Sequence, residues 1–242
     1  MIKNLPLKLT LVFGFIFIGM SAFKTDKKQD DARFVNFIVD PQKSNIELYW
    51  KNDNNELLNN FQNLKNYIEK KGKRLKFAMN AGMYMENYTP LGLFVHKQKI
   101  IHKLNTSTGS TNFYIQPNGV FYITTNKKAN VCSTSKYVHS RKVNFATQSG
   151  PMLLINGVIN PNFTKGSINT NIRNGVGVLP NHRVVFAISK QAVNFYDFAE
   201  YFKNMGCTNA LYLDGAISAM YLPEKNWEQL VGDFGVMIGI AE

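Results

Sequence analysis

Short apolar runs separated by turn residues dominate the pattern of hydrophobic and polar positions along the chain. Most runs are too short for helices and are bounded by Gly, Pro, Asn or Asp, which is typical of strands joined by turns. The pattern therefore predicts many strands. Their expected ranges are residues 34–39, 46–50, 76–79, 90–96, 100–104, 112–115, 120–124, 143–147, 152–155, 158–159, 176–179, 184–188, 210–213 and 235–240.

Three pairs of neighbouring runs are expected to form hairpins. The strongest signal is Asn156-Gly157 between residues 152–155 and 158–159, because both central positions of a type I′ turn need positive φ. The other two pairs are residues 90–96 with 100–104, and 112–115 with 120–124.

Apolar residues recur at helical spacing in only two segments, residues 55–71 and 194–205. A glycine follows each segment where a helix is expected to end, and Asn194 with Asp197 resembles a capping pair. We therefore predict two covering helices. Their apolar stripes comprise Leu57, Leu58, Phe61, Leu64 and Ile68 in the first, and Phe195, Phe198, Ala199 and Phe202 in the second.

Together these elements predict an α+β fold, with a strand-rich mixed sheet, many hairpins and two main covering helices. Residues 33–242 are expected to form a single domain, because no repeat or linker divides them. Residues 1–22 have the pattern of a signal peptide, with Lys3 and Lys8 before an apolar core at 9–20, and 23–32 form a polar lead-in. The apolar core is short for a membrane span, so cleavage is favoured over an uncleaved anchor. A secreted or periplasmic protein without stable membrane insertion is expected.

The net charge of +12 indicates anionic partners, and 45% apolar residues suit a packed globular domain. Basic residues are scattered in ones and twos, which disfavours nucleic acid as the partner and fits an anionic ligand better. No phosphate-binding loop, dinucleotide fingerprint or metal-ligand spacing occurs, so neither a cofactor nor a metal is expected. Cys132 and Cys207 fit either one disulfide bridge or two buried thiols.

Polar residues at the ends of apolar runs are the candidates for chemistry. Asp214 follows the run 210–213 and precedes Gly215, which places a carboxylate at the rim of a sheet. The alternative is a hairpin corner in which Asp214 caps its own turn. Asn80 and Gly82 end another strand in the same way, with Glu86 as a second carboxylate, although an Asn-centred loop explains them as well.

Arg173 stands where a polar loop enters the apolar run 176–179. Such a position suits a forked grip on phosphate or carboxylate, and the alternative is a surface arginine paired with a nearby acid. His96, at the end of a predicted strand, is interpreted as a structural or surface histidine.

Four segments in this order resemble the phosphodiester glycosidase domain, the family of the lysosomal "uncovering" enzyme that removes N-acetylglucosamine from mannose phosphate. They are residues 80–84 (Asn-Ala-Gly-Met-Tyr), 149–153 (Ser-Gly-Pro-Met-Leu) with 156–157, 173–177 (Arg-Asn-Gly-Val-Gly), and 213–215 (Leu-Asp-Gly) with Ser218. The resemblance covers about residues 77–239. Residues 90–93, 112–113, 117–121 and 210–215 are closer to a bacterial branch of secreted proteins with unknown substrate.

The resemblance implies a hydrolase that cleaves a sugar-1-phosphodiester in a phosphorylated or anionic glycan. In that hypothesis Arg173 binds the phosphate, and Asp214 acts at the anomeric carbon as a base or as electrostatic support. Glu86 is the reserve acid or base. Substrate would be oriented by the side chains of Asn80, Ser149 and Ser218 and by the backbone N–H groups of Gly82, Gly150 and Gly215.

The chain departs from the family pattern at Ala81 and at Ala216-Ile217, where glycines are common. Ile217 resists positive φ, so we expect a narrower pocket beside Asp214. These departures keep two alternatives open, a non-catalytic binder of anionic cell-envelope glycans and a structural envelope protein.

Overall fold

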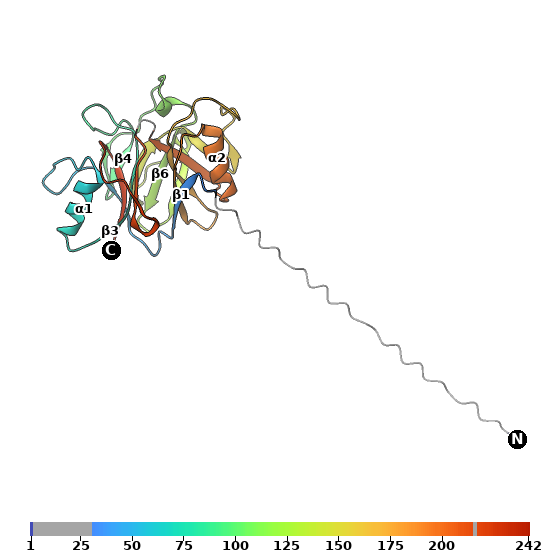
Figure 1. Ribbon diagram of the computed structural model, residues 1–242, viewed down its shortest axis with the longest axis horizontal. Coiled ribbons are helices and arrows are strands. Elements are labelled where there is room, and N and C mark those ends of the chain that lie inside the picture. Colours follow the sequence, from blue (N-terminus) through green and yellow to red (C-terminus); the bar gives the residue numbers. More distant parts are fainter. Residues whose placement is uncertain (2–30, 215–216) are drawn as a thin grey trace.

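The computed structural model describes residues 31–214 and 217–242, together with Met1. The predicted signal peptide, most of the lead-in, and Gly215-Ala216 therefore lie outside the described residues. The predicted α+β class is confirmed, and the strands outweigh the helices (Figure 1). Within the described part of the chain every strand pairing is antiparallel, and the strands divide among three sheets instead of one mixed sheet.

The first two sheets combine strands that are distant in the sequence, whereas the third is built from five consecutive strands. The first has the order β1 (Phe34–Val39), β12 (Val184–Ser189), β11 (Asn174–Val178), β13 (Asn209–Asp214), β9 (Met152–Ile155), β10 (Val158–Ile159). The second is β15 (Trp227–Glu228), β14 (Met220–Leu222), β3 (Leu75–Asn80), β16 (Met237–Ala241), β2 (Ile46–Tyr49). The third is β5 (Lys99–His102), β4 (Phe94–His96), β8 (Val143–Ser149), β6 (Gly119–Thr124), β7 (Ala129–Ser133).

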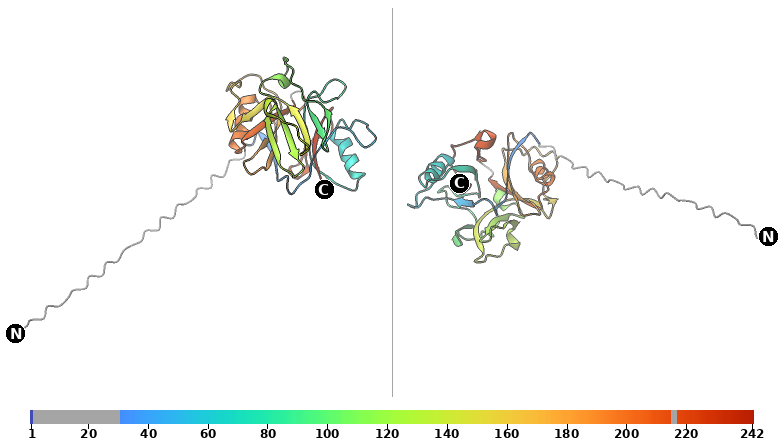
Figure 2. Two further views of the ribbon diagram at one scale, coloured as in Figure 1. Left: turned by 180° about the vertical axis from the view of Figure 1, so that it is seen from behind. Right: turned by 90° about the horizontal axis from the view of Figure 1, so that it is seen from below.

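One apolar core lies between the three sheets, which surround it in the view from below (Figure 2). Phe186 of the first sheet contacts Phe77 of the second and Phe121 of the third, with ring centroids 4.8 and 6.0 Å apart. All three rings are almost completely buried. The inward-facing side chains of each sheet therefore bury one another, which makes this part of the chain one folding unit.

The helix α1 (Phe61–Glu69) packs against the outer face of the second sheet, and it is shorter than predicted. The expected start at residue 55 is wrong. Asn55 and Asn59 adopt positive φ, and Asn60 caps the helix by accepting a hydrogen bond from the backbone N–H of Asn63. Leu58 belongs to the loop before the helix and is nevertheless buried. Its place in the predicted apolar stripe therefore reflects its burial and not a helical backbone.

The helix α2 (Phe195–Asn204) confirms the second helical prediction and covers the first sheet, on the opposite side of the molecule from α1 (Figures 1 and 2). The side chain of Asn194 accepts a hydrogen bond from the backbone N–H of Asp197 at 2.8 Å. Phe198 and Phe202 are fully buried against the sheet. The predicted capping pair and apolar stripe are thus both present.

Two of the three predicted hairpins form. The turn between β9 and β10 has Asn156 and Gly157 at positive φ, and β4 pairs with β5. The hairpin between residues 112–115 and 120–124 is wrong, because Asn112–Tyr114 form a 3₁₀ turn and β6 pairs with β7 and β8. The side chain of Asn118 donates a hydrogen bond to the carbonyl of Phe113. This backbone carbonyl therefore has a hydrogen-bond partner without pairing to another strand.

Candidate active site

The corner at Asp214 lies where the chain leaves the first sheet for the second. Strand β13 ends at Asp214 and pairs with β11 and β9, whereas β14, the next strand described, pairs with β3 and β15. The two strands flanking the corner do not pair with each other, so the alternative of a simple hairpin corner is wrong. The carboxylate therefore lies at a junction between sheets.

A buried amide network fixes the Asp214 carboxylate. Nδ2 of Asn80, at the end of β3, donates to Oδ2 of Asp214 at 2.7 Å. Oδ1 of Asn80 accepts from Nδ2 of Asn174 at 2.7 Å, and Oδ1 of Asn174 accepts from the backbone N–H of Asp214 at 3.1 Å. Because these groups come from β3, β11 and β13, the network joins the first two sheets at the corner.

Neighbouring hydrogen bonds hold the backbone of the corner. Oγ of Ser149 donates to the carbonyl of Leu213 at 2.5 Å, and Oγ of Ser218 donates to the carbonyl of Asp214 at 3.0 Å. Asn80 also donates to the carbonyl of Ile217 and accepts from the backbone N–H of Ala219. The side chains of Asn80, Ser149 and Ser218 thus converge on the corner and hydrogen-bond to protein groups there.

A cavity of about 500 Å³ opens beside Asp214. Glu86 lines the same cavity, so two carboxylates from different segments face one space. Asp214 is 5% exposed and Glu86 is exposed, which gives the two carboxylates different surroundings. The remaining lining residues are Met83, Tyr84, Met85, Leu91, Thr111 and Asn112.

Tyr84 forms part of the wall of this cavity. Burial raises the pKa of Tyr84 to about 12, and the negative charges of Asp214 and Asp233 contribute to the same shift. Its hydroxyl donates to the carbonyl of Asp233. Tyr84 is therefore protonated at neutral pH, and the hydrogen bond from its hydroxyl fixes its ring in the cavity wall.

Arg173 immediately precedes β11 and is fully buried, whereas the sequence suggested a sheet rim. Nε donates to the carbonyl of Val193 at 2.8 Å, and Nη2 donates to the carbonyl of Asn169 at 3.0 Å. The guanidinium also stacks on the ring of Phe195, with Cζ 3.7 Å from the ring centroid. It pairs with no acid among the described residues, so the alternative of a surface ion pair is wrong.

The charge of Arg173 is consequently held in an apolar setting. Burial lowers its pKa from the ordinary value, although arginine remains a cation in proteins. Within the described residues its Nη1 and the hydroxyl of Tyr212 are buried and make no hydrogen bond of good geometry, although the two side chains interact with each other. Burial raises the pKa of Tyr212 to about 12, while Arg173 acts to lower it and Asp214 to raise it. Tyr212 therefore lies within electrostatic reach of both.

The predicted glycines differ in their surroundings. A Cβ on Gly82 would lie 2.4 Å from Oγ1 of Thr147, and one on Gly150 would lie 2.6 Å from Cβ of Asn118. Both glycines therefore allow close packing against neighbouring protein segments. Gly215 lies outside the described residues.

Sequence reasoning missed three residues of this site, Asn174, Tyr84 and Tyr212. Each belongs to a segment that carried the family resemblance, but none has a distinctive spacing of its own. Asn174 is the clearest case, because its role depends on the pairing of β11 with β13, which brings residues 174 and 214 together. Only the sheet register reveals that contact.

Cys132 and Cys207 form no disulfide bridge with each other, and of the two Cys207 is buried while Cys132 is partly exposed. In the ranges 31–214 and 217–242, no group of three or more His, Cys, Asp or Glu side chains is arranged to hold a metal ion. The same ranges contain no helix with the length and apolar character of a membrane span.

Comparison with known proteins identifies the family. A family model described as phosphodiester glycosidase matches residues 73–234. The chain belongs to the phosphodiester glycosidase family. All of the residues in the Asp214 network, together with Arg173 and Glu86, fall inside the matched segment.

Known relatives extend the comparison. The uncharacterized protein YigE of Escherichia coli K12 is 41% identical over 187 residues, which is 77% of this chain and 73% of that protein. Among solved structures, the catalytic domain of zebrafish N-acetylglucosamine-1-phosphodiester alpha-N-acetylglucosaminidase, auto-inhibited by its pro-peptide, has a TM-score of 0.60 at 15% identity and covers 88% of this chain and 85% of that one. A hypothetical protein from Synechocystis has a TM-score of 0.51 at 15% identity, covering 86% and 59%. These structures share the fold.

Proposed function

We propose that the protein hydrolyses the bond between the anomeric carbon of a sugar and a phosphodiester, in a phosphorylated or anionic glycan. The observation that carries this proposal is a cavity lined by Asp214 and Glu86, within a chain of the phosphodiester glycosidase family. The signal-peptide pattern of residues 1–22 favours a secreted or periplasmic enzyme.

In the proposed reaction, water attacks the anomeric carbon while the bond from that carbon to the phosphate oxygen breaks. The electron pair leaves with the phosphate, which departs as a stable anion and needs little protonation. A carboxylate takes the proton of the attacking water. Asp214 is the preferred group at the anomeric carbon, because the amide of Asn80 holds it in one orientation. Glu86 is the second acid or base across the cavity.

Arg173 supplies the positive charge that stabilises the departing phosphate. Two of its nitrogens donate to main-chain carbonyls, which do not neutralise the cation, and no carboxylate among the described residues pairs with it. A buried cation without a counter-charge attracts an anion strongly because the surroundings have a low dielectric constant. Nη1 is the proposed donor, and because Arg173 is fully buried and does not line the cavity, its charge would act on the phosphate from inside the protein, beyond the cavity wall.

The roles of the other predicted residues follow their contacts. Asn80, Ser149 and Ser218 orient the corner, and thereby the Asp214 carboxylate, through the bonds described above. Gly82 and Gly150 permit the close packing that fixes the neighbouring segments. In the proposal these residues position the Asp214 carboxylate and do not contact the substrate themselves.

Asp214→Asn tests the proposal. The protein is incubated with a panel of sugar-1-phosphodiesters and with aryl glycosides of the same sugars, and sugar release is followed. We expect release from phosphodiesters in the parent protein and a loss of about a thousandfold or more in kcat in Asp214→Asn, because the base is removed. Glu224→Gln, an exposed carboxylate that does not line the cavity, is the matched control. Full turnover in folded Asp214→Asn would refute the role of Asp214.

Arg173→Met separates the proposed phosphate role from a structural one. Methionine keeps most of the buried volume but leaves the carbonyls of Val193 and Asn169 without their donor, so we expect the free energy of unfolding to fall by about 1–3 kcal/mol. We expect kcat/KM on phosphodiesters to fall by about a hundredfold or more. Large destabilisation with unchanged kcat/KM in the folded fraction would show that Arg173 serves only the fold.

A further inference from the structure

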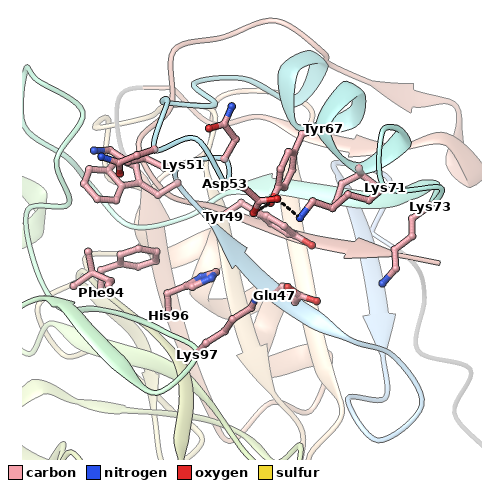
Figure 3. A pocket seen from close by; sticks show the side chains of 15 residues that line it. Glu47, Tyr49, Lys51, Asp53, Tyr67, Lys71, Lys73, Phe94, His96 and Lys97 are labelled. Atoms are coloured by element: carbon pink, nitrogen blue, oxygen red, sulfur yellow. Dashed lines mark hydrogen bonds and ion pairs between the residues drawn. The ribbon is translucent and has the colours of Figure 1, made fainter.

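A second cavity lies on the side of the molecule that carries α1. It has a volume of about 380 Å³, within the range of small-molecule sites of about 300–1,000 Å³. Its walls come from β2, from β4 and from α1 with the loop that follows it (Figure 3). None of its lining residues belongs to the cavity beside Asp214.

The charges around this second cavity are mostly positive. Four lysines line it, Lys51, Lys71, Lys73 and Lys97, against the two carboxylates of Glu47 and Asp53. Asp53 is already paired with Lys71 at 2.7 Å and accepts a hydrogen bond from the hydroxyl of Tyr67 at 2.7 Å. No ion pair engages Lys73 or Lys97 in the described ranges. Two ammonium groups are therefore available to an anion.

A neutral hydrogen-bonding group lies between these charges. Nδ1 of His96 lies 2.9 Å from the carbonyl of Leu48, which accepts only, so Nδ1 carries the hydrogen and Nε2 is the acceptor of the neutral ring. Burial lowers the pKa of His96, which favours that neutral form at pH 7. An acceptor of this kind pairs with a hydroxyl group and adds nothing to the binding of a bare anion.

Aromatic rings complete the wall. Trp50 and Phe94 contact each other edge to face at 6.1 Å, and Tyr49 is a further aromatic residue in the lining. Nε1 of Trp50 donates to the carbonyl of Tyr88, which fixes the indole. Aromatic rings next to charged and hydroxyl-accepting groups suit a ligand with apolar ring faces and polar edges.

We propose that this cavity binds an anionic sugar, a saccharide that carries a carboxylate or phosphate group. Lys73 and Lys97 take the negative charge, His96 accepts a hydroxyl hydrogen, and the rings of Trp50, Tyr49 and Phe94 contact the sugar ring. The proposal concerns binding alone and does not depend on turnover at Asp214. Because it shares no lining residue with the Asp214 cavity, it is a separate site for a second part of a glycan or a second molecule.

Trp50 provides the test because it lines the cavity and the chain has one other tryptophan, Trp227. Trp227→Phe leaves Trp50 as the reporter. Its fluorescence is titrated with tri-galacturonic acid, with glucose 1-phosphate, with neutral maltotriose and with inorganic phosphate. We expect a saturable change with at least one of the two anionic sugars, at a Kd below about 1 mM, and weaker binding of maltotriose and of inorganic phosphate by about tenfold or more.

Two charge variants in the Trp227→Phe background locate the binding. Lys73→Gln with Lys97→Gln should weaken binding of the anionic sugar by about tenfold or more. Lys142→Gln with Lys190→Gln removes the same charge from exposed positions outside this cavity and should change the Kd by less than about twofold.

Each possible result of these titrations either supports or overturns the proposed site. Loss of affinity confined to the Lys73 and Lys97 variant supports the site, and the better of the two anionic sugars shows whether carboxylate or phosphate is preferred. Absence of binding by both anionic sugars, equal binding of inorganic phosphate or maltotriose, or equal weakening in both charge variants would overturn it. Hydrolysis assays of the proposed function are unaffected by any of these results.

Discussion

Asn80 uses the whole hydrogen-bonding capacity of its side chain. Its two amide hydrogens go to Asp214 and to the carbonyl of Ile217, and its oxygen accepts from Asn174 and from the backbone N–H of Ala219. Because Asn80 is 1% exposed, water does not replace these partners. A single amide thus holds the carboxylate and both sides of the corner.

Removal of this amide should be strongly destabilising. Asn80→Ala removes the amide that bonds Asp214, Asn174 and the backbone at Ile217 and Ala219, so we expect a loss of about 2–4 kcal/mol in the free energy of unfolding. Urea denaturation measures it. Asn66→Ala, at an exposed position on α1, is the control and should change stability by less than about 0.5 kcal/mol. Equal effects of the two substitutions would contradict the network.

Part of this site is predictable from the sequence. Asp214 and Asn80 were both singled out from strand-end positions, and the structure joins them. The burial of Arg173 is not predictable from the local sequence, because the residues that enclose its guanidinium come from a later segment of the chain. Phe195 and Val193, which enclose the guanidinium, come from the start of α2 and the loop before it. That enclosure is a tertiary effect.

At the scale of elements, α2 has a defined start. Asn194→Ala removes the acceptor for the backbone N–H of Asp197 and should lower the free energy of unfolding by about 1 kcal/mol. Chemical denaturation is again the measurement. Asn204→Ala, at the exposed end of the same helix, should have a much smaller effect. A larger loss for Asn204→Ala would show that the cap is not what stabilises the helix.

The packing of α2 on the first sheet depends on a glycine in β11. A Cβ on Gly177 would lie 2.6 Å from Sγ of Cys207 and 2.7 Å from Cδ1 of Phe202. Gly177→Ala should therefore destabilise the protein by about 1–3 kcal/mol through overpacking. Thermal unfolding checks this. Ile38→Val, at an exposed position of β1 in the same sheet, adds no volume and tests whether any substitution in this sheet has the same effect.

The two helices show how far the spacing of apolar residues predicts a helix and its ends. For α2, the cap, the apolar stripe and the terminal glycine agree, and the predicted range is nearly right. For α1, the stripe continues through Leu57 and Leu58 into a segment that is not helical. Asn55 and Asn59 adopt positive φ there. Apolar spacing reports burial, and the backbone conformation is decided by capping and turn residues.

At the scale of the molecule, the sequence predicted strand-rich α+β structure but not three sheets. Strand β3 lies between β14 and β16, which follow it by well over a hundred residues. Local patterns specify which residues form strands and which face is buried. Pairing between distant strands is decided by the shared core, where Phe77, Phe121 and Phe186 meet.

His96 connects the third sheet to β2 and should make the stability of the whole molecule depend on pH. Burial lowers its folded-state pKa, so the unfolded chain binds a proton more readily around the ordinary pKa of histidine, about 6.5. Stability contributed by neutral His96 is present above that pH and is lost as the pH falls toward the folded-state pKa. Thermal unfolding between pH 7 and 5 should show a shallower decline in His96→Asn, and an identical decline in both proteins would contradict this.

The central claim is that the protein cleaves the bond between the sugar carbon and the phosphate oxygen. Hydrolysis of a sugar-1-phosphodiester in water enriched in oxygen-18, with mass spectrometry of both products, tests it most directly. Attack at the anomeric carbon, as the positions of Asp214 and Glu86 favour, predicts the label in the released sugar, once corrected for exchange of the reducing sugar with water. Label in the phosphate product would mean attack at phosphorus and would contradict the account.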